Sequence, residues 1–275
     1  MKKPFAKRSL GQNFLSDPNY VNKIISALDP ASGETIIEIG PGRGALTERL
    51  AESGANIIAI ELDRDLVPLL REKFHGNKNI HIVEADVLET DIAELLDDPK
   101  FKILNFRSER PGPRTAKLVA NLPYYISTAI LQKLAGQRHL FSELVLMFQR
   151  EVVERITAEP GSSERGFLTV LAEAAFEIER LTDVPPTAFR PQPKIWSSVV
   201  RLRPKPVSGI DEAAFMRLVS TGFNQKRKTI LNNLKALYPN VSEMLETAGI
   251  DPKRRAETLT IEEWISLLGR DIEDK

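Results

Sequence analysis

The stretch TIIEIGPGRGA, residues 35–45, decides how the chain is predicted to fold. Its first half is a short, mostly apolar run, which is typical of a buried strand. Its second half contains three glycines, and the following ALTERLAES, residues 45–53, has the pattern of a helix. A buried strand, a glycine-rich turn and a helix in this order are typical of the first unit of a doubly wound α/β sheet. We therefore expect such a sheet to start here.

The residues on both sides continue this alternation of strand and helix. Residues 19–28 predict a helix, with Asp17 as its cap before Pro18. Further strands are predicted at 56–62, 80–86, 117–123 and 143–149, with another helix at 66–74. Two last strands, at 177–185 and 197–204, have little room for a crossover helix between them, so we expect an antiparallel hairpin at one edge. The pattern predicts a mainly parallel, doubly wound α/β sheet.

Beyond residue 207 the pattern becomes wholly helical. Four prolines, at 191, 193, 204 and 206, mark the transition, and four helical segments follow. We therefore expect an α/β domain over 1–206 and a small helical domain over 207–275. The polar stretch 105–115 predicts an exposed loop.

Composition excludes several classes of protein. The 275 residues include no cysteine, which excludes disulfides, thiolate metal sites and a cysteine nucleophile. Three scattered histidines make a zinc site unexpected, and we expect no metal. The basic start MKKPFAKRSLG is followed by no apolar signal segment, and no run reaches the roughly 18 apolar residues of a membrane span. We expect a cytoplasmic protein with no membrane partner.

The net charge is zero, but the charges are unevenly distributed. Residues 1–10 carry four basic side chains and no acid, and residues 201–235 carry eight basic side chains against two acids. Acidic residues gather instead around 84–98. This asymmetry favours a nucleic-acid partner, although basic runs are also common on solvated surfaces.

Four polar or small residues fall at the carboxyl ends of successive predicted strands: Gly40, Glu61, Asp86 and Asn121. Ligands of open parallel sheets bind at this rim. Glycines there allow a ligand close to the backbone, and an acid about 20 residues further on accepts hydrogen bonds from a ribose diol. With Ala45 the string also satisfies G-x-G-x-x-G/A, so a nicotinamide dinucleotide and S-adenosylmethionine (SAM) both remain open from these residues.

NLPYY, residues 121–125, predicts a substrate clamp at the same rim. The side-chain carbonyl of Asn121 and the backbone carbonyl of Leu122, held extended by Pro123, could accept from the two hydrogens of an adenine amine. They would thereby turn its lone pair toward a SAM methyl group. Tyr124 offers a face on which the base can stack. Phe189, in a proline-rich loop, is a candidate for the second face.

The chain resembles the ribosomal small-subunit RNA adenine N6,N6-dimethyltransferases, the KsgA/RsmA family, along nearly its whole length. The matching segments are LGQNFLSD (10–17), IEIGPGRGALTERL (37–50), IELDRDL (60–66), NLPYYIST (121–128), FQREVVERITAEPGS (148–162), VPPTAFRPQPK (184–194) and FNQKRKTILNNLK (223–235). The resemblance implies a Rossmann-like class I SAM-dependent methyltransferase domain over 1–206. It also implies an RNA- and ribosome-docking helical domain, with Lys226, Arg227 and Lys228 on a basic helix.

The resemblance further implies the residues of the site. Asn13, Leu15, Gly40, Glu61, Asp86 and Asn121 would line the SAM site, with Asp86 reaching the adenine of SAM and residues 10–17 folding over it. Residues 121–124 would receive the target base, and Phe189 would stack on it. The expected product is two adjacent dimethyladenosines in the 3′-terminal hairpin loop of 16S rRNA. We expect a monomer that acts on the immature 30S subunit late in its assembly.

Several residues depart from the family pattern, and three other functions stay open. Arg43 in the glycine loop, Tyr125 after the clamp, Arg190 and Trp196 beside the substrate loop, and the stretch 105–115 are departures. The alternatives are a large-subunit (23S) rRNA adenine methyltransferase, a non-catalytic RNA-binding assembly factor, and a nicotinamide oxidoreductase. The last lacks an evident His or Lys for hydride transfer.

Overall fold

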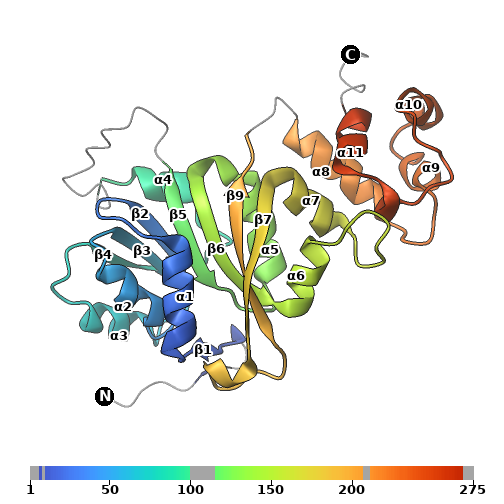
Figure 1. Ribbon diagram of the computed structural model, residues 1–275. Helices are drawn as coiled ribbons and strands as arrows, with labels where there is room; N and C mark the ends of the chain where they lie inside the picture. The colour runs from blue at the N-terminus through green and yellow to red at the C-terminus, as the bar shows by residue number, and fades with distance from the viewer. Residues whose placement is uncertain (1–5, 8–9, 100–114, 207–210, 269–275) are drawn as a thin grey trace. The chain divides into compact units, whose positions relative to one another are not determined.

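The computed structural model describes residues 6–7, 10–99, 115–206 and 211–268. They form two compact units, which are described separately (Figure 1). The first unit consists of Met1–Val153 and Glu177–Pro204, and the second of Glu154–Phe176 and Lys205–Lys275. The predicted loop at 105–115 lies, apart from Thr115, outside the described residues.

A seven-stranded sheet organises the first unit, in the order β4-β3-β2-β5-β6-β9-β7. Its strands are β2 (Thr35–Ile39), β3 (Asn56–Glu61), β4 (Ile80–Glu84), β5 (Ala116–Asn121), β6 (Phe141–Gln149), β7 (Phe176–Val184) and β9 (Ser197–Pro204). The first five in chain order pair in parallel, and β9 pairs antiparallel to β6. The strand order changes direction between β2 and β5, which is where such sheets bind ligands. The predicted doubly wound sheet with its edge pair is confirmed.

Helices cover the sheet because its central strands are apolar on both faces. Every residue of β2 and β3 is buried, as expected for inner parallel strands. Helices α1 (Pro18–Leu28) and α2 (Ala45–Ala51) contribute Ile24, Leu28 and Leu50 to the core, and Figure 1 shows them in front of the sheet. Asp17 caps α1 as predicted, its carboxylate accepting from the backbone N–H of Asn19 at 2.9 Å. Further helices of the first unit are α3 (Val67–Lys73), α4 (Ile92–Asp97) and α5 (Ser127–Gly136).

Two short strands were not predicted from the sequence. β1 (Phe14–Leu15) and β8 (Phe189–Arg190) pair antiparallel and form a separate two-stranded sheet. Two residues are too few to show a strand periodicity, so no local pattern indicates this pairing. It fixes the N-terminal segment to the loop that leads into β9.

The second unit is a helical body around one buried tryptophan. Its helices include α7 (Phe167–Ala175), α8 (Glu212–Gly222), α9 (Ile230–Leu234), α10 (Val241–Thr247) and α11 (Ile261–Leu268). Trp264 is fully buried, and its ring lies 5.7 Å from that of Phe223. A Cβ atom on Gly222 would lie only 2.3 Å from the indole, so only glycine fits there. No described helix has both the length and the apolar character to cross a membrane.

The second unit includes a segment that the sequence-based expectation placed in the α/β domain. Helix α7 groups with the C-terminal helices, whereas the predicted boundary at 206 left residues 154–176 with the α/β domain. Val170 of α7 belongs to the apolar core of the helical unit, which explains the grouping. Helix α6 (Arg150–Ile156) spans the division between the units.

Candidate active site

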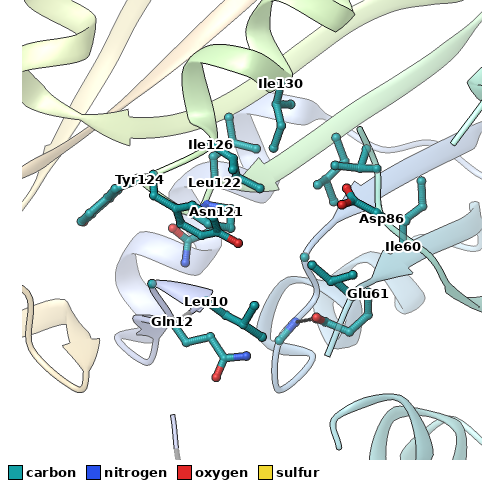
Figure 2. Close-up of a pocket in the computed structure, with 18 of the residues that line it drawn as sticks. Leu10, Gln12, Ile60, Glu61, Asp86, Asn121, Leu122, Tyr124, Ile126 and Ile130 are labelled. Carbon is teal, nitrogen blue, oxygen red and sulfur yellow. Dashed lines mark hydrogen bonds between the residues drawn. The ribbon is translucent and has the colours of Figure 1, made fainter. Parts of the chain in front are cut away.

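A pocket opens at the carboxyl ends of β2, β3, β4 and β5, within the first unit (Figure 2). Counting the open space at its mouth, it holds about 770 Å³, a volume typical of small-molecule sites. Gly40, Glu61, Asp86 and Asn121 all line it. The structure therefore brings together the four rim residues that were predicted from four separate strands.

The glycine loop accepts a close neighbour on its outer side. Gly42 has a φ of +59°, a conformation that favours glycine, and a Cβ atom there would lie 2.9 Å from the Phe14 ring. The Arg43 guanidinium lies over the same ring, 4.5 Å from its centroid. Phe14 lines the pocket and Arg43 does not. Arg43, a departure from the family pattern, thus contacts the N-terminal segment beside the pocket.

Glu61 is held by backbone donors on both of its oxygens. Its Oε2 accepts from the N–H of Gly42 at 3.0 Å, and its Oε1 accepts from the N–H of Asp63 at 2.9 Å. Burial raises the pKa of Glu61, and the two N–H donors oppose that rise. Each carboxylate oxygen can accept a second hydrogen bond. The side chain therefore keeps acceptor capacity for a ribose hydroxyl in the pocket that it lines.

Asp86 lies on the opposite side of the pocket from the N-terminal segment. Its Oδ1 accepts from the backbone N–H of Leu88 at 2.8 Å, which fixes the carboxylate. Figure 2 shows this carboxylate directed toward the open space, with Ile60 and Ile130 among the apolar residues of the lining. An acceptor at the end of an apolar slot suits the amino edge of a planar base.

Asn121 is oriented by a residue far away in the sequence. Its side-chain nitrogen donates to the backbone carbonyl of Asn13 at 3.0 Å. A carbonyl can only accept, so the amide nitrogen must face it. The side-chain oxygen Oδ1 is then turned away from Asn13 and is available as an acceptor in the pocket.

The turn after Asn121 is fixed at both ends. The N–H of Leu122 donates to the carbonyl of Met147 on β6 at 3.2 Å, and Ser127 Oγ donates to the carbonyl of Tyr124 at 3.1 Å. The hydroxyl of Tyr124 lies 2.7 Å from the Oγ of Ser197, the first residue of β9. Burial raises the pKa of Tyr124, so it stays a neutral phenol. Its ring is thus held in place at the pocket wall.

The N-terminal segment closes one side of the pocket and is tied down by Asp63. One carboxylate oxygen of the buried Asp63 accepts from Lys7, and the other accepts from Gln12 Nε2 at 2.7 Å. Lys7 also pairs with the exposed Asp65 at 2.6 Å. Burial alone would raise the pKa of Asp63, but the bonds from Lys7 and Gln12 outweigh it, and this pKa lies below its usual value. The segment 10–15 is therefore held by a charged network next to Glu61.

The comparisons with known proteins decide the family. The family model described as "Ribosomal RNA adenine dimethylase" matches residues 5–270. The chain belongs to this family. Among members of the family, Ribosomal RNA small subunit methyltransferase A of Geobacter sulfurreducens is 43% identical over 270 residues, which cover 95% of this chain and 94% of the relative. The protein of the same name from Lactiplantibacillus plantarum is 40% identical over 271 residues, 95% of this chain and 88% of the relative.

Solved structures agree with membership of the rRNA adenine dimethylase family. A dimethyladenosine transferase from Plasmodium falciparum has a TM-score of 0.77 at 26% identity, covering 94% of this chain and 98% of the other. The 23S rRNA methyltransferase ErmE has a TM-score of 0.68 at 27% identity, covering 94% and 99%. The predicted Rossmann-like fold of SAM-dependent methyltransferases is confirmed.

Two predicted site residues lie elsewhere. Leu15 and Phe189 do not line the pocket; they pair with each other across β1 and β8, and both belong to the buried core. Phe189 is 0% exposed. The expectation that Phe189 stacks on the target base is therefore not supported, because its ring is enclosed by apolar neighbours. The other predicted residues of the rRNA adenine dimethylase site, Asn13 and residues 121–124, line the pocket.

The three basic residues that were predicted to lie on a helix lie outside it. Lys226, Arg227 and Lys228 lie in a turn between α8 and α9, and the helix begins only at Ile230. Thr229 caps it, its hydroxyl accepting from the N–H of Asn232. All three basic side chains are exposed, and Lys226 Nζ donates to the carbonyl of Ser163 at 2.7 Å. Their role in RNA binding stays a prediction.

The sequence did not reveal the residues that orient the site. Gln12, Asp63 and Ser197 each contact a pocket residue or the segment that closes the pocket. Gln12 and Asp63 lie inside segments that resemble the family, but no local pattern indicates that their side chains meet. Ser197 lies directly after the proline-rich loop, and its partner Tyr124 is 73 positions away, so the local sequence around Ser197 does not indicate their contact.

Proposed function

We propose that this protein transfers methyl groups from SAM to the N6 amines of two adjacent adenosines in the 3′-terminal hairpin loop of 16S rRNA, on the immature 30S subunit. Family membership supports the reaction, and the names of the relatives support the small subunit. The observation that carries the proposal is the orientation of Asn121. Its oxygen is presented to the pocket by the bond from its nitrogen to Asn13.

The residues at the glycine-loop end of the pocket suit SAM. Gly40 leaves room for a ligand against the backbone, Glu61 has acceptor capacity for ribose hydroxyls, and Asp86 can accept from an adenine amine. When bound, SAM supplies a methyl group on a positively charged sulfur. Asn13 and the other residues of segment 10–14 would exclude water from that end of the pocket.

The other end of the pocket suits the amine that receives the methyl group. Asn121 Oδ1 and the carbonyl of Leu122 would each accept one hydrogen of the adenine amine, and this holds its lone pair toward the donor. Tyr124 would stack on the base, an interaction worth roughly 1–3 kcal/mol. Catalysis would come mostly from positioning, which can contribute about 7–11 kcal/mol. The transfer would leave a positively charged methylammonium and a neutral thioether; the ammonium is acidic and can release its proton to water, so the chain needs no strong base here.

The proposal also covers how the protein contacts the subunit and where it acts. The exposed turn with Lys226, Arg227 and Lys228 would contact RNA phosphates on the subunit. The enzyme would act in the cytoplasm as a monomer, late in subunit assembly.

Mass spectrometry of small-subunit RNA tests the proposal. Immature 30S subunits would be incubated with the protein and isotopically labelled SAM, and the 3′-terminal hairpin would be analysed for labelled dimethyladenosine. An Asn121→Ala variant serves as the control, and we expect it to fold while transferring no label. Wild-type protein that leaves both adenosines unlabelled would overturn the proposal.

A large-subunit target is the second candidate. The similarity to ErmE, whose title names 23S rRNA, favours it. Primer extension on both rRNAs after deletion of the gene separates the two, because dimethylated adenosines stop the polymerase. A new read-through in 23S rRNA, with 16S rRNA unchanged, would favour this second target.

A further inference from the structure

Exposed hydrophobic side chains gather on one rim of the first unit. Among the residues that the structure describes, five large hydrophobic side chains are exposed, and two of them, Leu62 and Tyr125, line the pocket. Ile195 and Trp196, which are 42% and 44% exposed, directly precede β9. Such a concentration beside a pocket is typical of a binding surface.

Strand register places Trp196 at the same rim as the pocket. Asn121 on β5 lies opposite Met147 on β6, and Gln149 on β6 lies opposite Ser197 on β9. Neighbouring strands are about 4.8 Å apart, so Trp196 lies roughly two strand spacings, about 10 Å, along the rim from the clamp. The N–H of Arg150 donates to its carbonyl at 3.0 Å, which fixes its backbone.

A direct contact links the clamp to this position. The hydroxyl of Tyr124 bonds to Ser197, the residue that follows Trp196. Trp196 itself does not line the pocket that would receive the target base. It is therefore suited to a base next to the target and not to the target base itself.

The loop that carries Trp196 also favours an anionic partner. Residues 185–196 contain Arg190 and Lys194, both exposed, and no acidic residue. An aromatic face next to positive charge is the usual arrangement for unpaired nucleotides, whose bases stack while their phosphates pair with cations.

We propose that Trp196, with Ile195 beside it, stacks on an unpaired RNA base that neighbours the methylated adenosine. This inference rests on the proposed function, because the target base must enter the pocket at Asn121. It assigns a substrate contact to a residue that departs from the family pattern.

Steady-state kinetics on immature small subunits test this contact. Trp196→Leu is expected to raise the KM for the subunits by roughly 5- to 150-fold, the cost of one lost stacking contact. Trp196→Phe keeps an aromatic face, and its KM is expected to stay within about 3-fold of wild type. The KM for SAM should be unchanged in both variants. An unchanged KM for subunits in Trp196→Leu, or an equal rise in both variants, would overturn the proposal.

Fluorescence gives a second, independent readout because the chain has only two tryptophans. Trp264 is fully buried, so Trp196 is the one that acrylamide can reach. Binding of a synthetic RNA hairpin, with two unpaired adjacent adenosines in its loop, is expected to protect Trp196 from acrylamide. Trp196→Phe should show no such change. A bound complex in which acrylamide quenching is unaltered would overturn the contact, whereas a wild-type protein unable to methylate RNA would overturn the proposed function instead.

Discussion

The side-chain amide of Asn121 donates to the backbone carbonyl of Asn13, 108 residues away in the sequence. This single bond decides which end of the amide faces the pocket. Two requirements follow: residue 121 needs a donor for Asn13 and an acceptor for the substrate amine. Asparagine meets both requirements. A substitution that removes only the donor or only the acceptor tests the two requirements separately.

Asn121→Asp is expected to lower the rate of methyl transfer by on the order of 100- to 1,000-fold, as the loss of one preorganised polar contact typically does. An aspartate has no donor for the Asn13 carbonyl, and its negative oxygens would repel it. Rates from single-turnover assays with saturating SAM measure the effect. A variant that retains wild-type rates would show that the Asn13 contact does not orient the clamp.

The bond between Tyr124 and Ser197 is expected to position the tyrosine ring for stacking. Ser197→Ala leaves a partly buried phenol without a partner, which costs about 1–3 kcal/mol. We expect a higher KM for RNA and an unchanged KM for SAM.

Tyr124→Phe is the matched partner of Ser197→Ala in a double-mutant cycle. If the two residues act through their bond, the double variant should lose less than the sum of the single losses, by about 1 kcal/mol. Strictly additive losses in KM would contradict this role.

Asp63→Asn is expected to weaken the binding of SAM more than it slows transfer. The buried Asp63 bonds both Lys7 and Gln12 and so holds the segment that closes the pocket. Loss of its charge should raise the Kd for SAM by roughly 10-fold, since bonds to charged groups contribute about 1.5–3 kcal/mol. Calorimetric titration measures the Kd.

Asp65→Asn is the control for this substitution, because Asp65 pairs with the same lysine but is 62% exposed. Exposed ion pairs contribute little, so its Kd should change by less than about 3-fold. Equal effects of the two variants would argue against a special role for Asp63.

Glu38 on β2 is expected to make stability depend on pH. It is 1% exposed, its Oε2 accepts from the Thr47 hydroxyl at 2.6 Å, and burial raises its pKa to about 7. A carboxyl whose pKa is raised on folding supports the fold fully below its unfolded pKa of about 4.5, and this support is lost as the pH rises toward 7. The change corresponds to roughly 3 kcal/mol, since each pKa unit is worth about 1.4 kcal/mol.

Chemical denaturation between pH 5 and 8 checks this prediction. Wild-type protein should lose stability over that range, and Glu38→Gln, which cannot ionise, should lose less. Parallel curves for the two proteins would show that Glu38 does not titrate in the folded state.

Locally encoded features of the molecule were predictable from its sequence. The strands are short apolar runs, and Gly40, Glu61, Asp86 and Asn121 follow them at positions that a parallel sheet brings together. The geometry of the sheet converts four local signals into one pocket, so its location required no knowledge of distant contacts.

The contacts that orient the site could not be predicted in the same way. Asn13–Asn121, Tyr124–Ser197 and Gln12–Asp63 join residues 108, 73 and 51 positions apart. Phe189 illustrates the same difficulty, because an aromatic residue in a proline-rich loop can face a substrate or the core. In the structure its ring is buried in the core, and its strand pairs with Leu15, a pairing that leaves no periodic trace in the sequence.

The N-terminal segment 10–14 serves as a wall of the pocket and also supplies the carbonyl that holds Asn121. A ligand bound at the glycine-loop end of the pocket would therefore contact the same backbone segment that orients the Asn121 amide at the other end. Thermodynamic reciprocity makes such an influence mutual, so each ligand must alter the affinity of its companion by an identical factor. The binding affinities of the methyl donor and of the acceptor are thus expected to depend on each other before methyl transfer takes place.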